Sequence, residues 1–269
     1  MLDHPKNDIF IHMDAKTKSY NPDEILSLVK HSRIINVPRI KVTWGAYSQL
    51  EACLLLLEAA TSLGEYEHYH LLSEADLPIK KQEDIINFFE EHHGQEFVNF
   101  QSEVFGFGKR VRFYYPLQEV IGRRGNILLR LVSKICLKFQ EVMHVRRNKN
   151  VNFQKGTDWV SITDELARYI LSKREWIREV FHATLLPTEQ CIHTLIANNP
   201  YFRNRLHHKE FDDERLKATM RLIDWKRGSP YVFRSTDLEE IKNSEAMFAR
   251  KFDENIDADI IRKIQELYS

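Results

Sequence analysis

The sequence has little glycine and cysteine, and it lacks the motifs of several common enzyme classes. Only nine glycines and three cysteines occur in 269 residues. There is no glycine-rich P-loop or Rossmann motif, so neither of these nucleotide sites is predicted. No G-x-S-x-G sequence occurs either, which argues against an α/β-hydrolase. The cysteines (Cys53, Cys136 and Cys191) are far apart and lie among apolar residues. They predict no disulfide framework and no zinc ribbon, and we expect a reducing, cytoplasmic setting.

Net charge of either sign is also missing. The 39 basic residues balance the 39 acidic residues, so the composition does not favour a nucleic-acid-binding protein. No apolar stretch is long enough to cross a bilayer, and the first residues lack the apolar core of a signal peptide. Hydrophobic residues make up 43% of the chain, enough for a substantial core. We therefore expect a soluble protein with one domain over residues 1–269.

Short apolar runs alternate with amphipathic segments along most of the chain. Strands are predicted over 9–13, 33–37, 41–43, 69–72, 96–101, 159–162 and 219–225. Helices are predicted from 21 and over 48–63, 82–93, 126–145, 164–172, 187–197 and 258–267. This alternation indicates an α/β fold with a mostly parallel sheet flanked by helices, whose functional loops lie at the strand ends.

Residues 109–155 interrupt this alternation as a basic helical insertion. The segment has twelve Lys or Arg residues and two acidic residues. Its helix is apolar on one face, formed by Leu129, Val132, Cys136, Phe139 and Met143. One interpretation is a helix on an anionic membrane surface, with charge from Arg123, Arg124, Arg146 and Arg147. The other is an ordinary core stripe beneath a solvated basic face.

One Asp-x-Asp sequence could in principle hold a divalent cation on a diphosphate. It is formed by Asp257 and Asp259 and opens the last predicted helix. Aspartate is favoured there by capping and by the helix dipole alone, so we interpret the pair as structural and predict no metal site.

Seven short motifs follow one another along nearly the whole chain. They are I-H-M-D-A-K (11–16), V-T-W-G-A-Y-S (42–48), L-S-E-A-D-L-P-I-K (72–80), K-G-T-D-W (155–159), L-P-T-E (186–189), I-D-W (223–225) and F-A-R-K-F-D (248–253). In this order they resemble the core-2/I-branching N-acetylglucosaminyltransferase family, which also contains peptide O-xylosyltransferases and bacterial relatives. The resemblance implies a GT-A-like α/β fold. Two departures stand out: Glu74 replaces a frequent glycine, and the fold is expected to lack the family's first strand and helix.

The resemblance also implies an inverting, metal-independent reaction with a UDP-sugar. Glu189 then matches the catalytic base, which removes the proton from the attacking hydroxyl. By residue type alone, Glu189 would only complement a helix dipole.

The leaving UDP needs positive charge, which the family resemblance assigns to Lys251. Arg234 or Arg227 would be the second cation, and the sequence does not decide between them. Asp14 and Trp44 match positions that contact uridine.

On the acceptor side, Trp225 matches an aromatic position, although a core tryptophan at a strand end is an equal alternative. Three more residues, Glu103, Lys109 and Arg110, match acceptor-side positions loosely. Asp76, in the L-S-E-A-D-L-P-I-K motif, is assigned to the acceptor side, with a structural role in turning the chain before Pro78 as the alternative.

Together these features predict a bacterial-type transferase of cell-surface polysaccharide synthesis. It would move a sugar, expected to be N-acetylglucosamine, with xylose as the alternative, to a hydroxyl of a glycan or lipid-linked oligosaccharide. No cofactor is expected besides the UDP-sugar as co-substrate, and no nucleic acid. The protein would lie in the cytoplasm, peripheral at the inner face of the membrane. The alternative function is a catalytically impaired member that binds glycan or nucleotide as a scaffold.

Overall fold

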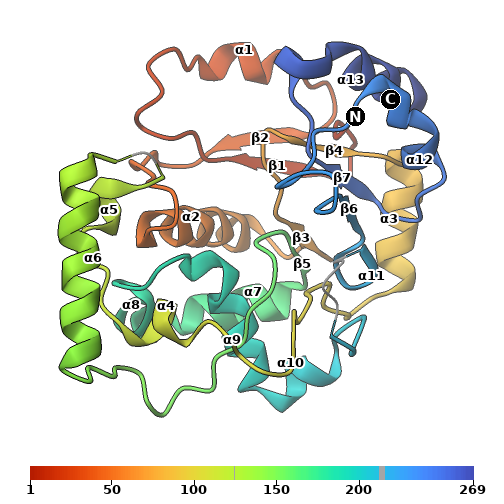
Figure 1. Ribbon diagram of the computed structural model, residues 1–269. Helices are drawn as coiled ribbons and strands as arrows, with labels where there is room; N and C mark the ends of the chain where they lie inside the picture. The colour runs from red at the N-terminus through yellow and green to blue at the C-terminus, as the bar shows by residue number, and fades with distance from the viewer. Residues whose placement is uncertain (124, 212–215) are drawn as a thin grey trace.

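The computed structural model describes residues 1–123, 125–211 and 216–269, and it is a mixed α/β protein (Figure 1). At the N-terminal end, β1 (Asp8–Ile11) pairs in parallel with β2 (Arg33–Asn36), so that Asp8 lies opposite Arg33. Helix α1 (Pro22–Leu26) lies in the crossover between them. It begins where predicted, because the Asn21 side chain accepts a hydrogen bond from the Asp23 amide and Pro22 fits the first turn.

The main core surrounds α2 (Tyr47–Leu63), which runs through the middle of the molecule (Figure 1). Its buried leucines pack with α7 (Asp164–Ser172), α8 (Arg174–Phe181) and α9 (Cys191–Ala197) in the largest hydrophobic cluster. Helix α7 begins at Thr163, whose hydroxyl caps the Leu166 amide. The α2, α7 and α9 helices thus agree with the apolar periodicity of the sequence.

A three-stranded sheet, which joins one strand from the N-terminal half of the chain to two from the C-terminal half, carries one end of the candidate site. Its order is β4 (Asp76–Pro78), β7 (Phe248–Arg250) and β6 (Arg221–Ile223). The central strand β7 is antiparallel to β4 and parallel to β6. Helices α3 (Gln82–Glu91), α12 (Leu238–Lys242) and α13 (Glu254–Tyr268) lie beside this sheet (Figure 1).

The strand pairing is more divided than the predicted mostly parallel sheet. The remaining strand pair joins β3 (Tyr69–His70) to β5 (Ser161–Ile162), and these two strands are antiparallel. Across the described ranges the strands form three small sheets, with two parallel and two antiparallel pairs. The α/β class is confirmed, with shorter ladders than its sequence pattern indicates.

Two predicted strands do not form ladders, for a visible reason. In the 41–43 segment, the Val42 and Thr43 amides donate to the side chains of Asp14 and Ser48. The 96–101 segment makes only isolated bridges, from Glu96 and Phe97. Side chains therefore take the Val42 and Thr43 amides. In the 96–101 segment the Glu96, Phe97 and Gln101 amides instead donate to backbone carbonyls outside any regular ladder.

The basic insertion folds into α4 (Gly108–Arg112), α5 (Gln118–Ile121) and α6 (Ile127–Val142). Helix α6 agrees with the helix predicted over 126–145, and it stands at the outer edge of the molecule (Figure 1).

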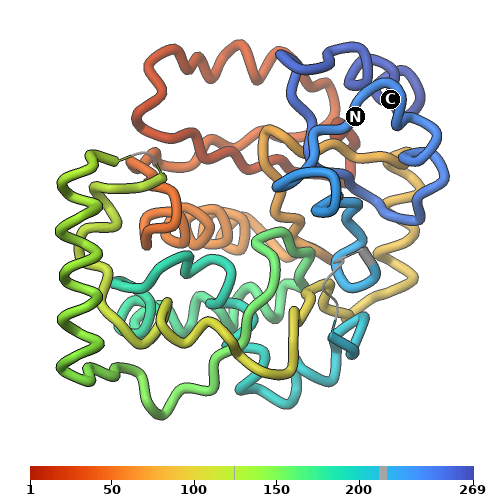
Figure 2. The backbone as a smooth tube through the Cα atoms, in the orientation of Figure 1, coloured from red at the N-terminus to blue at the C-terminus, as the bar shows by residue number. Residues whose placement is uncertain are grey.

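The remaining described elements are short. They are η1 (Pro187–Glu189), α10 (Pro200–Asn204), α11 (Leu216–Thr219) and η2 (Ser235–Asp237). The two chain ends lie side by side (Figure 2), and Met1 packs against the cluster that holds Ile264 and Tyr268.

Candidate active site

Glu189 ends the 3-10 turn η1, directly before α9. The predicted helix over 187–197 is therefore a tight turn followed by an α-helix. Leu186 precedes it in the left-handed region (φ 54°) and donates its amide to the Gly45 carbonyl at 2.9 Å. A branched residue in that region costs roughly 1–2 kcal/mol, so packing and this hydrogen bond hold the turn in place.

The Glu189 carboxylate lies between two cations. Its Oε2 atom is 2.9 Å from Arg110 Nη1 and 3.2 Å from Lys155 Nζ. The Glu189 side chain is 23% exposed and that of Lys155 only 9%, so the carboxylate lies at the border between interior and solvent. Lys155 also donates to Gln101 Oε1 at 2.5 Å. A partly open carboxylate held in one orientation suits a general base.

Phe107 lies under both cations. The Arg110 guanidinium and the Lys155 ammonium are 4.6 Å and 4.7 Å from its ring centroid. Cation–π contacts of this kind fix the side chains that flank Glu189. Arg110, which was predicted to contact the acceptor, thus lies against the candidate base.

Asp158 is a second carboxyl group at this centre. Its burial, and next the negative charge of Glu189, raise the pKa of Asp158 to about 6. Its Oδ1 atom is enclosed and accepts no hydrogen bond from the described residues. No role was predicted for Asp158, although it belongs to the K-G-T-D-W motif (155–159), which was the available signal.

Gly156 lets the Asp158 loop pass close to Glu189. Its amide donates to the Glu189 carbonyl at 3.0 Å. A Cβ atom at this position would lie 2.2 Å from the Asn99 carbonyl oxygen and 2.4 Å from the His193 ring. Only glycine fits such a close approach without displacing backbone.

The raised pKa of Asp158 predicts how the free energy of unfolding changes with pH. Its native pKa exceeds the unfolded value, so ionisation opposes folding as pH rises from about 4 through about 6. Asp158→Asn should therefore increase the free energy of unfolding by about 1–3 kcal/mol at pH 8, with no gain below about pH 4. Urea unfolding at both pH values measures this. The exposed Asp84→Asn is the control and should show no such change. A gain of equal size at both pH values would contradict the prediction.

Arg250, at the end of β7, joins the L-S-E-A-D loop to the Asp158 loop. Its Nη1 atom donates to Asp76 Oδ1 at 2.7 Å and to Ser73 Oγ at 2.5 Å. Its guanidinium lies 4.1 Å from the Trp159 ring centroid. Asp76 Oδ2 meanwhile accepts the Ser73 amide. The Asp76 carboxylate, predicted on the acceptor side, therefore holds its own loop closed.

Lys251 follows Arg250 and is half-buried. Its carbonyl accepts the Phe233 amide at 2.9 Å, which places Arg234 beside it. Arg234 is exposed, and its guanidinium forms no ion pair within the described part of the chain. Arg227 is instead paired with three carboxylates, those of Asp224, Asp237 and Glu240. Of the two arginines left open by the sequence, Arg234 is thus the one with an uncommitted charge.

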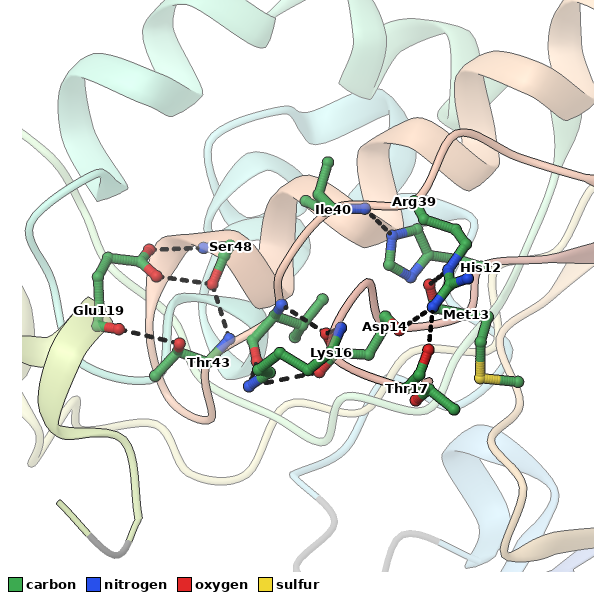
Figure 3. Close-up of polar contacts among 11 residues, drawn as sticks. His12, Met13, Asp14, Lys16, Thr17, Arg39, Ile40, Thr43, Ser48 and Glu119 are labelled. Atoms are coloured by element: carbon green, nitrogen blue, oxygen red, sulfur yellow. Dashed lines mark hydrogen bonds and ion pairs between the residues drawn. The ribbon is translucent and has the colours of Figure 1, made fainter. Parts of the chain in front are cut away.

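Asp14 and Trp44, the two predicted uridine contacts, come from the loops after β1 and before α2. The Asp14 carboxylate accepts the Lys16 amide at 2.9 Å and the Val42 amide at 3.3 Å, and it pairs with the Lys16 ammonium at 3.4 Å. Figure 3 shows Arg39 lying across this loop, where it donates to the carbonyls of Met13, Asp14 and Thr17.

Trp44 is 48% exposed, and the Arg123 guanidinium lies 5.9 Å from its ring centroid. Trp44 follows Val42 and Thr43, and the Val42 amide donates to the Asp14 carboxylate. Trp44 also precedes Gly45, whose carbonyl accepts the Leu186 amide. The predicted uridine contacts are therefore linked by backbone to the turn that carries Glu189.

The remaining predicted acceptor residues are more dispersed. Trp225 lies just beyond β6 and is 45% exposed, so it is no core tryptophan. Glu103 is exposed. Lys109 pairs with Glu141 of α6 at 2.9 Å. The geometry brings Arg110, but not Lys109, to Glu189.

The Asp-x-Asp pair has the structural role that its position indicates. Asp257 accepts hydrogen bonds from the amides of Ser235, Asp259 and Ile260. Asp259 pairs with Arg262 and Lys263. In the described ranges, no group of three or more His, Cys, Asp or Glu side chains is arranged to hold a metal ion.

A mixed α/β fold with Glu189 held between Arg110 and Lys155 fits the GT-A-like class. The chain belongs to the core-2/I-branching enzyme family, whose model, Branch: Core-2/I-Branching enzyme, matches residues 1–246. This confirms the family predicted from the ordered motifs, together with its GT-A-like fold.

Relatives with curated names are xylosyltransferases. Xylosyltransferase sqv-6 of Caenorhabditis briggsae is 25% identical over 97% of this chain and 33% of its own length. Xylosyltransferase oxt of Drosophila melanogaster is 24% identical over 97% of this chain and 30% of its own. Xylosyltransferase 2 of Rattus norvegicus is 21% identical over 96% and 30%. The chain thus spans about a third of the length of these relatives.

Proposed function

We propose that this protein is an inverting, metal-independent transferase that uses a UDP-sugar. The observation that carries the proposal is the Glu189 carboxylate, held by Arg110 and Lys155 and partly open to solvent. Asp158 adjoins it. Lys251 directly follows β7, and its carbonyl binds the amide of Phe233, the neighbour of Arg234.

In the proposed reaction, Glu189 takes the proton of an acceptor hydroxyl. The hydroxyl oxygen forms a bond to the anomeric carbon of the donor sugar, from the face opposite UDP. The bond from that carbon to the phosphate oxygen breaks, and its electron pair leaves with UDP. Lys251 and Arg234 would neutralise the charge that develops on the diphosphate, the task that a divalent cation performs in other transferases. Asp14 and Trp44 would hold the uridine.

The donor is proposed to be UDP-N-acetylglucosamine, with UDP-xylose as the alternative that the relatives' names support. The acceptor would be a hydroxyl of a glycan or lipid-linked oligosaccharide in cell-surface polysaccharide synthesis. This places the reaction on the cytoplasmic face of the membrane.

The test combines UDP binding with sugar transfer, both in EDTA. Calorimetry should show UDP binding to the wild-type protein, weakened about 10- to 100-fold by Lys251→Ala because a charge-assisted contact is lost. Arg234→Ala should weaken binding similarly, whereas Arg227→Ala should lower the unfolding temperature instead. Lys149→Ala, an exposed change outside the site, is the control.

Transfer or hydrolysis of either UDP-sugar should persist in EDTA. Activity that requires added Mn²⁺ would overturn the metal-independent mechanism. A protein that binds UDP but transfers neither sugar would support the alternative of a nucleotide-binding scaffold.

A further inference from the structure

Helix α6 exposes seven of its ten apolar side chains. Of its sixteen residues, only Gln140 is buried. The apolar residues on its outer face, together with Met143 just beyond its end, are 45–79% exposed: Ile127, Leu128, Leu131, Val132, Ile135, Phe139, Val142 and Met143. Three of them, Leu131, Ile135 and Phe139, are four residues apart and so share one face.

This exposure corrects one of the two sequence interpretations. Val132, Phe139 and Met143 were candidates for an ordinary core stripe, and they face solvent. Leu129 and Cys136, the other two members of that stripe, are half-buried. Amphipathicity alone does not say which face meets the protein body.

The opposite face fixes α6 to the body of the molecule. The Gln140 side chain accepts the Tyr114 amide at 2.7 Å and donates to the Tyr114 carbonyl at 3.0 Å. Helix α6 stands at the edge of the molecule (Figure 1), and its apolar side chains remain exposed there. Exposed apolar patches of this kind mark interaction sites.

Positive charge flanks the apolar face. Arg130, Lys134 and Lys138 are exposed on α6, and Arg123 and Arg146 are exposed near its two ends. The one carboxylate within the helix sequence, Glu141, is paired with Lys109 and Lys138. The surface around the apolar face therefore carries a net positive charge.

Not all of the four arginines predicted to contact an anionic membrane surface belong to this positive surface. Arg147 donates to the carbonyls of Glu179 and Val180, so the body of the protein holds it. Arg124 lies outside the described residues. The positive surface therefore comes from the three basic residues of α6 together with Arg123 and Arg146.

The helix is too short to cross a bilayer. Sixteen residues span about 24 Å at 1.5 Å per residue, less than the ~30 Å hydrocarbon core. Among the described residues no helix is long and apolar enough to cross a membrane. An amphipathic helix with basic flanks instead lies in the interface, its apolar face in the boundary between headgroups and acyl chains.

We propose that α6 docks this protein flat on an anionic lipid bilayer. Ile135, Phe139 and their neighbours would enter the acyl boundary while Arg130, Lys134 and Lys138 contact anionic headgroups. A second copy of the chain fits less well, because joining two α6 faces would bring these cations together. This inference does not rest on the transfer reaction.

The test is vesicle co-sedimentation without any sugar substrate. Wild-type protein should bind vesicles of phosphatidylcholine with 30% phosphatidylglycerol, more weakly those of phosphatidylcholine alone, and less as salt increases. Lys134→Gln with Lys138→Gln should weaken binding about tenfold or more, since each cation near the surface contributes roughly a fivefold effect. Ile135→Ser with Phe139→Ser should weaken it at least about tenfold.

Matched controls separate docking from general stickiness or unfolding. Leu28→Ser with Val104→Ser changes two exposed apolar residues elsewhere and should leave binding unchanged. Circular dichroism and the unfolding temperature confirm that each variant is folded. The proposal fails if the wild-type protein ignores anionic vesicles, or if the control pair weakens binding as much as the α6 pair. It also fails if the α6 pair only converts a dimer to a monomer, which would assign the face to self-association.

Discussion

Glu189→Gln should reduce kcat for sugar transfer by about a hundredfold to ten-thousandfold. The amide cannot take the proton of the attacking hydroxyl, and a positioned base contributes roughly this factor. Glutamine preserves the size of the side chain, so UDP affinity measured by calorimetry should change little. The measurement is steady-state transfer with each UDP-sugar, at saturating donor and acceptor.

Two controls make this result specific. Glu83→Gln alters an exposed carboxylate in the first turn of α3 and should leave kcat unchanged. Asp158→Asn tests whether the neighbouring carboxyl group is the base instead. A full loss of activity in Asp158→Asn, with Glu189→Gln still active, would transfer the role from one carboxylate to the other.

Arg250→Met should lower the free energy of unfolding by about 2–4 kcal/mol. Its guanidinium is paired with Asp76, and the two side chains are only 17% and 5% exposed. Removing one partner leaves a buried carboxylate without its cation, which is a large destabilisation. Urea unfolding at neutral pH measures the effect.

The pairing itself is tested by a second change. Asp76→Asn added to Arg250→Met should recover part of the lost stability, because no unpaired charge remains. Arg262→Met breaks an exposed pair with Asp259, whose side chains are 68% and 41% exposed, and should cost less than about 1 kcal/mol. If the double variant is no more stable than Arg250→Met alone, loss of packing over Trp159 explains the destabilisation instead.

Local signals in the sequence predicted most of the helices. The Asn21 cap, the apolar run of α2 and the Thr163 cap are properties of neighbouring residues, and the structure contains the corresponding helices. Strand partners are not local. The 41–43 segment is extended, but Asp14 and Ser48 take its amides, and no periodicity within the segment reveals that.

In the candidate site, too, the sequence predicted individual residues but not the long-range contacts between them. The order of motifs predicted Glu189, Lys251 and Asp14 as members of one site, but not their contacts. Arg250 meets Asp76 across 174 residues, and Arg110 meets Glu189 across 79. The role of Arg250 in closing the L-S-E-A-D loop was therefore missed, although it directly precedes Lys251.

The hydrogen bond from the Leu186 amide to the Gly45 carbonyl has a consequence for the order in which the two substrates bind. It joins the tight turn that aims Glu189 to the peptide segment that carries Trp44. A nucleotide that shifts the Trp44 segment on arrival would move the carboxylate with it. Donor occupancy would then change the angle at which Glu189 meets the second substrate. Such coupling favours compulsory binding order, with the sugar nucleotide first and the hydroxyl second.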